Sequence, residues 1–200
     1  PLILTDQISV DDLLAKAKNI GDQLKGYAEK MVFSYADIRT YRKVQSNLER
    51  NDIKFREFEE EDMHYIAKHL AALNSNWGYT LATCGEKINL EQYGIEHNKC
   101  VDDDLMIKYF SEDERLMDFL GVEIVRGDLF NPQSTIIKRK KNKDKGQRAF
   151  CGCIVSKDIG EYNTCPHLCE YCYANTSKET ALKNWQRHKE NPNAETIIGK

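Results

Sequence analysis

The pattern of apolar and polar residues predicts strands and helices in alternation over the first 83 residues. Short apolar runs at residues 1–5, 31–35 and 79–83 are typical of buried strands. Between them, apolar residues recur every three or four positions, which predicts amphipathic helices. The apolar face of the first helix comprises Leu13, Leu14, Ala17, Ile20 and Leu24, that of the second Tyr41, Val44 and Leu48, and that of the third Met63, Ile66, Ala67, Leu70 and Leu73.

Strands that alternate with helices build parallel sheets through right-handed crossovers. We therefore expect an α/β fold of parallel strands with crossover helices. Three strands cannot close a barrel, so the expected architecture is a partial or permuted TIM-like barrel. Since Pro1 already lies in a predicted strand, we expect a fragment that lacks an N-terminal part, with a processed start as the alternative.

Helical patterns continue at residues 103–110 and 112–120, and a last helix begins at Ser177. Residues 121–150 lack clear periodicity and carry a basic run at 138–145. We accordingly expect three parts: a partial α/β domain over 1–120, a basic irregular connection over 121–150, and a cysteine-rich iron–sulfur segment with a terminal helix over 151–200, packed on the same domain.

The composition narrows the protein class. The chain has 200 residues, of which 40% are hydrophobic and 30% charged, with 11 Gly and 4 Pro, and this excludes collagen-like, low-complexity and wholly disordered proteins. No apolar run approaches the roughly 20 residues of a transmembrane helix, and no secretory signal is visible. We therefore expect a cytoplasmic protein that does not contact a membrane.

The net charge is −3. Residues 131–200 carry 13 Lys and Arg against 7 Asp and Glu, so the C-terminal third is basic. The run at 138–145 could contact nucleic-acid phosphates, although no aromatic residue interleaves it for base stacking. A solvated loop is the alternative.

The seven cysteines carry the main chemical signal; they are Cys84, Cys100, Cys151, Cys153, Cys165, Cys169 and Cys172. An odd number of cysteines without a secretory signal argues against a secreted disulfide scaffold, and clustered thiols in a reducing compartment favour metal binding. Inert or disulfide-bonded cysteines are the alternative.

The last three cysteines have the spacing C-x3-C-x2-C. Three thiolates so close together can hold one inorganic centre, either zinc or an iron–sulfur cluster. A four-iron cluster held by Cys165, Cys169 and Cys172 would leave one iron open for a substrate or a cofactor, so the site would be catalytic. His167 could complete a zinc set or be an ordinary loop residue.

The other four cysteines suffice for a second site. Cys151 and Cys153 are two residues apart and can reach one metal, and Cys84 follows a predicted strand, where α/β folds place their sites. We expect Cys84, Cys100, Cys151 and Cys153 to share a zinc ion or a second iron–sulfur cluster. The alternative is that Cys84 and Cys100 are buried apolar-like residues.

Two carboxylates follow predicted strands and are catalytic candidates. Asp37 could hold a substrate hydroxyl or an Arg, and a helix-capping Asp is the alternative. Glu86 could support the metal site or be merely solvated. Four polar residues lie between the two cysteine groups, namely Lys157, Asp158, Tyr162 and Asn163. For these we expect loop-ordering hydrogen bonds, and a role in the chemistry is the alternative.

Two resemblances bear on the cysteines. The C-x3-C-x2-C spacing with Tyr171 before the last cysteine resembles the signature of radical S-adenosylmethionine enzymes, which implies a [4Fe–4S] cluster on Cys165, Cys169 and Cys172 whose open iron binds S-adenosylmethionine. Much of the chain is also similar to the domain-of-unknown-function 1848 family, a cysteine-rich group regarded as radical-SAM-like, of which roughly the first third would be absent here. The segments that carry the similarity are 1–5, 33–44, 83–86, 93–95, 99–102, 143–148, 151–153, 156–160, 162–165 and 171–175.

Two functions follow from these observations. The first is an iron–sulfur protein that acts as a radical-S-adenosylmethionine-like enzyme on an unknown substrate. The second is a non-enzymatic zinc or iron–sulfur module that binds nucleic acid through its basic C-terminal third.

Overall fold

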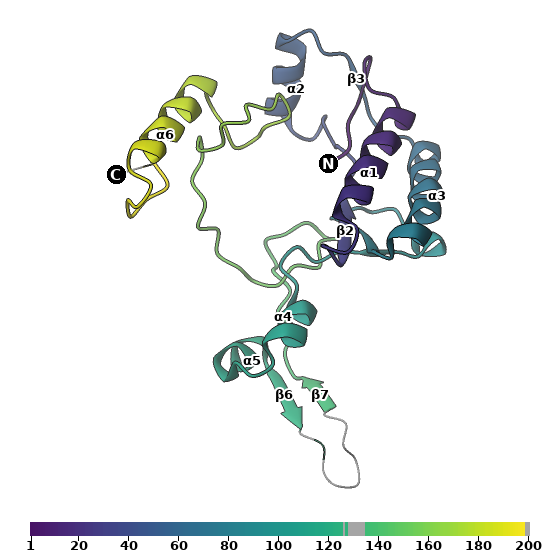
Figure 1. The fold of residues 1–200 in the computed structure, drawn as a ribbon, viewed down its shortest axis with the longest axis vertical. Helices are drawn as coiled ribbons and strands as arrows, with labels where there is room; N and C mark the ends of the chain where they lie inside the picture. Colours follow the sequence, from purple (N-terminus) through teal and green to yellow (C-terminus); the bar gives the residue numbers. More distant parts are fainter. Residues whose placement is uncertain (126, 128–134, 199–200) are drawn as a thin grey trace. The chain divides into compact units, whose positions relative to one another are not determined.

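The computed structural model describes residues 1–125, 127 and 135–198, and the chain forms two compact units (Figure 1). The first, here called the loop unit, comprises Pro1–Lys16, Tyr35–Met63 and Asp158–Lys200. The second, here called the sheet unit, comprises Ala17–Ser34 and His64–Lys157. Residues 126 and 128–134 of the expected irregular connection lie outside the described residues.

Helices and strands alternate along the chain, which confirms the α/β class. The helices are α1 (Val10–Leu24), α2 (Arg42–Arg50), α3 (Glu60–Trp77), α4 (Asp103–Phe110), α5 (Glu114–Leu120) and α6 (Lys178–Glu190), with a short 3-10 turn at Glu91–Tyr93. The strands are β1 (Leu4–Thr5), β2 (Lys30–Phe33), β3 (Phe55–Arg56), β4 (Thr80–Thr83), β5 (Ile95–His97), β6 (Val122–Val125) and β7 (Thr135–Lys138).

A small parallel sheet lies at the centre of the sheet unit. Its strand order is β2-β4-β5, and both strand pairs are parallel, with Met31 opposite Leu81 and Leu81 opposite Ile95. Leu81, Ala82 and Ile95 are buried. The expected parallel pairing of the strands near residues 31–35 and 79–83 is thus confirmed, and the described strands form open sheets rather than a closed barrel.

The N-terminal strand pairs differently from the expectation. In the loop unit, β1 runs antiparallel to β3, with Leu4 opposite Arg56, and a single parallel bridge joins Leu2 to Tyr35. The two-residue strand β3 is too short to leave a periodic pattern in the sequence, so this partner could not be predicted.

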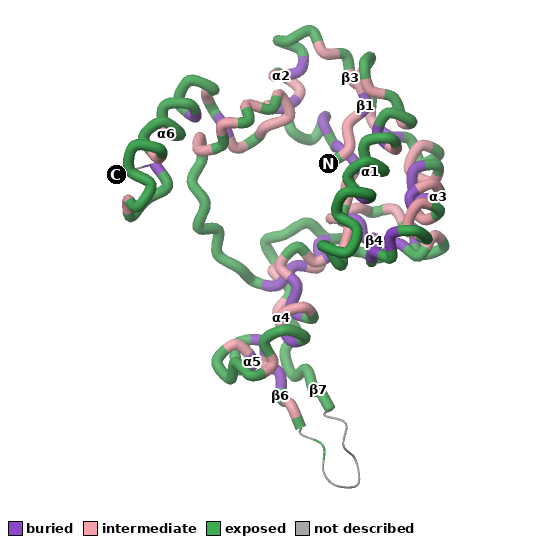
Figure 2. The backbone as a smooth tube through the Cα atoms, viewed as in Figure 1, coloured by how far each residue is buried: buried purple, intermediate pink, exposed green. Residues whose placement is uncertain are grey.

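The end of α3 packs against α1 within the sheet unit. The indole Nε1 of Trp77 donates a hydrogen bond to Asp22 at 2.7 Å, and the hydroxyl of Tyr79 donates one to the Gly21 carbonyl at 2.7 Å. A Cβ on Gly21 would lie 2.6 Å from the Trp77 ring, so only glycine fits at this contact. Figure 2 shows the buried residues of α3 on one side of the helix, as its apolar spacing predicted.

Helices α4 and α5 and strands β6 and β7 lie together in the sheet unit (Figure 1). Their core contains Ile107, Met117, Leu120 and Val122, together with Ile154 from the cysteine-rich segment. Asp102 and Asp113 begin the two helices by accepting hydrogen bonds from backbone N–H groups of the first turn, as N-cap aspartates do. This packing fixes the chain beside Cys153, because Ile154 belongs to the core.

The loop unit has its own apolar core. Ala36, Ile38, Val44 and Leu48 are buried there, and Tyr171 of the cysteine loop packs against them. Helix α6 follows Ser177, whose hydroxyl accepts a hydrogen bond from the N–H of Thr180, so the expected last helix is confirmed.

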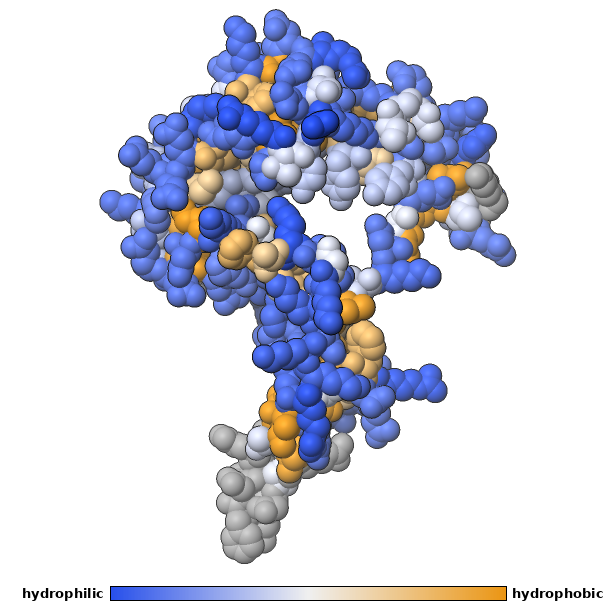
Figure 3. Space-filling view, turned by 180° about the vertical axis from the view of Figure 1, so that it is seen from behind, coloured by the Kyte–Doolittle hydropathy of each residue, from blue (hydrophilic) through white to orange (hydrophobic). Residues whose placement is uncertain are grey.

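Hydrophilic side chains cover most of the face drawn in Figure 3, in keeping with a mean hydropathy of −0.65. Within the described ranges, none of the helices combines the length and the apolarity that a membrane-spanning segment needs.

Candidate metal-binding sites

The C-x3-C-x2-C loop of the loop unit is ordered by Asn163, which precedes it. Asn163 adopts φ 60°, and its side-chain oxygen accepts hydrogen bonds from the N–H groups of Thr176 (2.5 Å) and Ser177 (3.2 Å). Its N–H donates to the Ala174 carbonyl at 3.3 Å. Both ends of the cysteine loop are therefore joined at one residue, which confirms the loop-ordering role expected for Asn163.

Asn175 closes the loop from the other side. Its Nδ2 donates to the Cys165 carbonyl at 2.8 Å, and its backbone N–H donates to the sulfur of Cys172 at 3.3 Å. The Lys43 amine, on α2, donates to the carbonyls of Tyr173 (2.8 Å) and Asn175 (2.6 Å). Asn175 is 8% exposed, and its Oδ1 has no hydrogen-bond partner among the described residues.

Glu170 attaches the middle of the loop to α2 and α6. Its carbonyl accepts a hydrogen bond from Asn47, and its carboxylate accepts one from Asn51 at 2.9 Å and pairs with Lys178. These contacts, with Tyr171 in the core, hold the backbone between the second and third cysteines.

The thiols of this loop are accessible. Cys165 and Cys169 are exposed and Cys172 is half-buried. Cys169 and Cys172 line a cavity of about 290 Å³ whose wall also includes Arg50, Ser177 and Lys178. The cavity places two thiols, two cations and the N-terminus of α6 around one space of ligand size.

The spacing of these three thiols can be compared with that required by a zinc ion and by an iron–sulfur cluster, the two centres expected for them. Within the described ranges, the set of three or more candidate ligand atoms that lie mutually within 4.8 Å consists of Asp102, Asp103 and Asp104, so at least one pair of these three sulfurs is more than 4.8 Å apart. A single zinc ion with Zn–S bonds of about 2.3 Å holds tetrahedral sulfurs about 3.8 Å apart. A cluster with one cysteine per iron spreads its sulfurs farther apart than that.

The other four cysteines meet in the sheet unit, at the end of the parallel sheet. Cys84 follows β4, and its N–H donates to the Phe33 carbonyl at 2.9 Å. Because neighbouring parallel strands end at the same edge, Cys84 lies close to Cys100, which follows β5; their sulfurs are 3.2 Å apart. The sulfur of Cys153 accepts hydrogen bonds from the N–H groups of Cys100 (3.1 Å) and Val101 (3.4 Å).

The thiols of this group form a row of neighbours in the order Cys84, Cys100, Cys153 and Cys151, with thiol contacts between successive members. Cys151 and Cys153 are buried, Cys84 is half-buried and Cys100 is exposed. Asn98 donates from Nδ2 to the Cys100 sulfur at 3.5 Å, and its buried Oδ1 has no partner within the described part of the chain. The four cysteines named from the sequence are thus brought together by the fold.

Burial is the largest influence on the pKa of three of these thiols. It raises the pKa of Cys151, and together with the adjacent Cys84 it raises the pKa of Cys100 to about 11. Burial acts in the same direction on Cys153, but hydrogen bonds from Val101 and Cys100 outweigh it and lower the pKa of Cys153 below its ordinary value. Cys153 is therefore held in a setting that favours the thiolate.

The two catalytic candidates lie in different units. Asp37 is exposed in the turn before α2 and accepts a hydrogen bond from the Thr40 hydroxyl at 2.7 Å, as a turn-forming aspartate does. Glu86 is half-buried two residues after Cys84. Neither is among the described residues that line the cavity beside Cys169.

The close group of Asp102, Asp103 and Asp104 is satisfied without a metal. Asp102 caps α4 and pairs with Lys30, and its two neighbours pair with Lys99 and Lys138. These ion pairs account for the acidic cluster.

The basic run at 138–145 is likewise engaged with its own unit. Besides the pairs of Lys138, Arg139 pairs with Glu123, and Lys143 donates to the Ala149 carbonyl at 2.6 Å. Several of the cations that could have met phosphates are thus already bound to protein oxygens.

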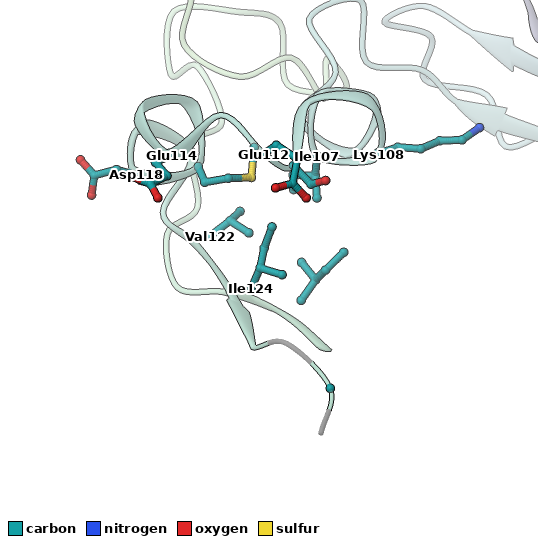
Figure 4. Close-up of a pocket in the computed structure, with 11 residues that line it drawn as sticks. Ile107, Lys108, Glu112, Glu114, Asp118, Val122 and Ile124 are labelled. Atoms are coloured by element: carbon teal, nitrogen blue, oxygen red, sulfur yellow. The ribbon is translucent and has the colours of Figure 1, made fainter. Parts of the chain in front are cut away.

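A larger cavity, of about 870 Å³, lies between α4, α5 and β6 in the sheet unit. Ile107, Val122 and Ile124 face it, whereas the amine of Lys108 extends away (Figure 4). No cysteine is among the described residues of its lining, so it is separate from the thiol chemistry.

Sequence reasoning missed three residues that position the thiols: Lys43, Asn98 and Asn175. The asparagines lie two residues before Cys100 and three after Cys172, and this proximity to cysteines was the available signal. No sequence signal indicates Lys43, because its amine donates to backbone carbonyls about 130 residues away in the chain.

Comparison with known proteins gives one match. A family model described as "Domain of unknown function (DUF1848)" matches residues 1–174, a range that contains all seven cysteines. No curated protein and no solved structure matches the chain.

Proposed function

The chain belongs to the domain of unknown function 1848 family, and from that premise we propose that it is an iron–sulfur protein whose loop at Cys165, Cys169 and Cys172 holds a [4Fe–4S] cluster. The observation that carries the proposal is the loop itself. Three accessible thiols sit on a backbone that Asn163, Asn175 and Lys43 tie down at both ends.

The chemistry of the donor set supports a cluster. Three thiols in one loop, two exposed and one half-buried, match three of the four irons of a cubane, which takes one cysteine per iron. The N–H of Asn175 points at the Cys172 sulfur, and such hydrogen bonds stabilise thiolates and tune a cluster's potential. His167 is exposed in the same loop, and no contact among the described residues assigns it a role.

We propose further that the protein is a radical-S-adenosylmethionine-like enzyme. A cluster with an open iron supplies one-electron reduction of S-adenosylmethionine, which yields an organic radical that abstracts hydrogen from a substrate. The chain's own residues would then bind and orient. Arg50, beside the cavity of about 290 Å³, favours a ligand with an anionic group, and the N-terminus of α6 adds its positive dipole end, whereas Lys178 is already paired with Glu170. A partial or permuted TIM-like barrel belongs to the same proposal.

Anaerobic purification tests the cluster. We expect about four iron and four sulfide per chain, and Cys169→Ala should lose nearly all of both. The matched control is His167→Ala, an exposed residue of the same loop, which should keep its iron. Iron content that Cys169→Ala leaves unchanged, or that His167→Ala abolishes, would refute the assignment.

The enzymatic part has its own test. The reduced protein is incubated with S-adenosylmethionine, and 5′-deoxyadenosine is measured; the proposal requires its formation by the wild type and its loss in Cys169→Ala. A protein with a full cluster that forms none is a non-enzymatic iron–sulfur module. Nucleic-acid binding by such a module has no specific observation in its favour, because several cations of the basic run are paired within the sheet unit.

A further inference from the structure

We propose that Cys84, Cys100, Cys151 and Cys153 bind a single zinc ion that fastens the end of the parallel sheet to the segment at 151–155. This site lies entirely in the sheet unit and is independent of the cluster proposed for the loop unit. The argument rests on sulfur spacing, on hydrogen bonds to sulfur, and on the local charge.

The spacing of the sulfurs fits one ion. The Cys84 and Cys100 sulfurs are 3.2 Å apart, and Cys153 contacts both Cys100 and Cys151. Two sulfurs on one tetrahedral zinc ion lie about 3.8 Å apart, given bonds of about 2.3 Å. A disulfide would need about 2.05 Å, and a cubane would keep its cysteines farther apart than 3.2 Å. Four thiols are one of the ligand sets that structural zinc sites use.

The four thiols lie in a row that an ion would close. No three of the four sulfurs lie mutually within 4.8 Å, so an ion would draw the end members, Cys84 and Cys151, inward. Each is followed by a glycine that leaves room for the backbone turn. Gly85 has φ +68°, a conformation that L side chains rarely adopt, and a Cβ on Gly152 would lie 2.9 Å from Lys99 Cγ.

Hydrogen bonds already support the thiolate form. The Cys153 sulfur accepts two backbone N–H groups, and Asn98 donates to the Cys100 sulfur. Hydrogen bonds from residues around the ligands orient those ligands and contribute to the affinity of a metal site. The buried Oδ1 of Asn98 has no hydrogen-bond partner among the described residues. A buried polar atom of this kind, next to the Cys100 sulfur, is a second indication of a polar binding site.

The charge around the thiols suits the product of binding. One Zn²⁺ takes up four thiolates, four protons leave to solvent, four Zn–S bonds form and no electron moves. The resulting centre carries two negative charges. The guanidinium of Arg148 lies beside Gly85, the residue after Cys84, since a Cβ on Gly85 would be 2.8 Å from its Nη2, and its positive charge would partly offset that of the centre.

The ion would connect parts that are far apart in sequence. Cys84 and Cys100 follow β4 and β5, whereas Cys151 and Cys153 precede Ile154, which is buried in the core of α4, α5 and β6. One zinc ion therefore joins the sheet to this second core, and its binding energy becomes folding energy of the sheet unit.

The test uses the full chain with Cys165, Cys169 and Cys172 all changed to Ser, so that the proposed cluster site is removed. Reduced protein is titrated with Co²⁺, whose tetrahedral thiolate complexes absorb visible light, and Zn²⁺ then displaces it. We expect one equivalent of Co²⁺ to bind per chain and one equivalent of Zn²⁺ to displace it. In that background, Cys100→Ser should weaken binding by more than the roughly 10- to 100-fold typical of a lost outer contact, and Asn98→Ala should fall within that range.

A second measurement does not depend on those variants folding. The wild-type chain is alkylated with and without zinc, and the modified cysteines are mapped by mass spectrometry; zinc should protect Cys84, Cys100, Cys151 and Cys153 as a set. Equal modification with and without zinc would overturn the proposal, as would a disulfide between Cys84 and Cys100 or bound iron in place of zinc. Loss of iron from the cluster loop would leave this result unchanged, so failure of one proposal is distinguishable from failure of the other.

Discussion

Lys43→Met is the sharpest test of how the cysteine loop is held. The Lys43 amine donates to the carbonyls of Tyr173 at 2.8 Å and Asn175 at 2.6 Å, and methionine keeps most of the side-chain volume while removing both bonds. Hydrogen bonds to charged groups contribute about 1.5–3 kcal/mol each when buried. Because Lys43 is only half-buried, we take about 1 kcal/mol for each bond, or about 2 kcal/mol in total.

A loss of about 2 kcal/mol raises the local opening equilibrium of the loop roughly 30-fold, since 1.4 kcal/mol is tenfold. Amide hydrogen exchange reads this equilibrium directly. The informative amides are those of Asn163, bonded to the Ala174 carbonyl, and Asn175, bonded to the Cys172 sulfur. Both should exchange roughly 30-fold faster in Lys43→Met, and a chelator should remove iron correspondingly faster.

The matched control is Lys183→Met, at an exposed position of α6 in the same unit, which should leave these amides unchanged. Amides of α2 around Val44 should keep their protection, because that residue remains in its core. Unchanged exchange at Asn175 would refute the reasoning. Equal acceleration at Val44 would also refute it, since the substitution would then have loosened the whole unit.

Three further outcomes follow from the sheet unit. Gly85→Ala should lower the free energy of unfolding by about 1–2 kcal/mol, because φ +68° disfavours a Cβ and Arg148 must also move; a thermal melt with zinc present measures it. Ile154→Ala should cost about 2–4 kcal/mol in urea unfolding, since its side chain is buried in the core of α4 and α5, and a smaller loss than 1 kcal/mol would contradict that packing. The hydrogen bond from Lys138 lowers the pKa of Asp104, so this pair stabilises the fold above pH ~4 and loses its effect as the pH falls through the lowered pKa. The difference in the free energy of unfolding between wild type and Asp104→Asn should therefore stay constant from pH 5 to 7 and shrink below pH ~4.

The sequence predicted those elements whose packing leaves a periodic trace. α3 buries Ile66 and Leu70 on one side, and β4 buries Leu81 and Ala82, so burial itself imposed the patterns. The hairpin of β6 and β7 was not predicted because all four residues of β7, Thr135–Lys138, are exposed. Backbone pairing alone specifies such a strand, and backbone pairing leaves no signature in the side chains.

Only part of the candidate sites could be predicted from the sequence. Cysteine spacing predicted which thiols belong together, and the fold brings Cys84 to Cys100 through the parallel order of β4 and β5. What holds the thiols could not be predicted. The bonds of Lys43 to backbone carbonyls depend on where α2 lies relative to the loop, and any residue type can supply a carbonyl.

The two cysteine sets differ in how far their thiols are exposed to solvent, a property that separates structural from reactive metal sites. In the sheet unit, Cys151 and Cys153 are buried, and hydrogen bonds cover the Cys153 sulfur, as expected of a closed structural centre. In the loop unit, Cys165 and Cys169 are exposed, and a cavity opens beside Cys169. A centre there would be within reach of a second molecule. A zinc ion on the partly buried set would have a structural role, and the proposed chemistry would take place at the exposed loop.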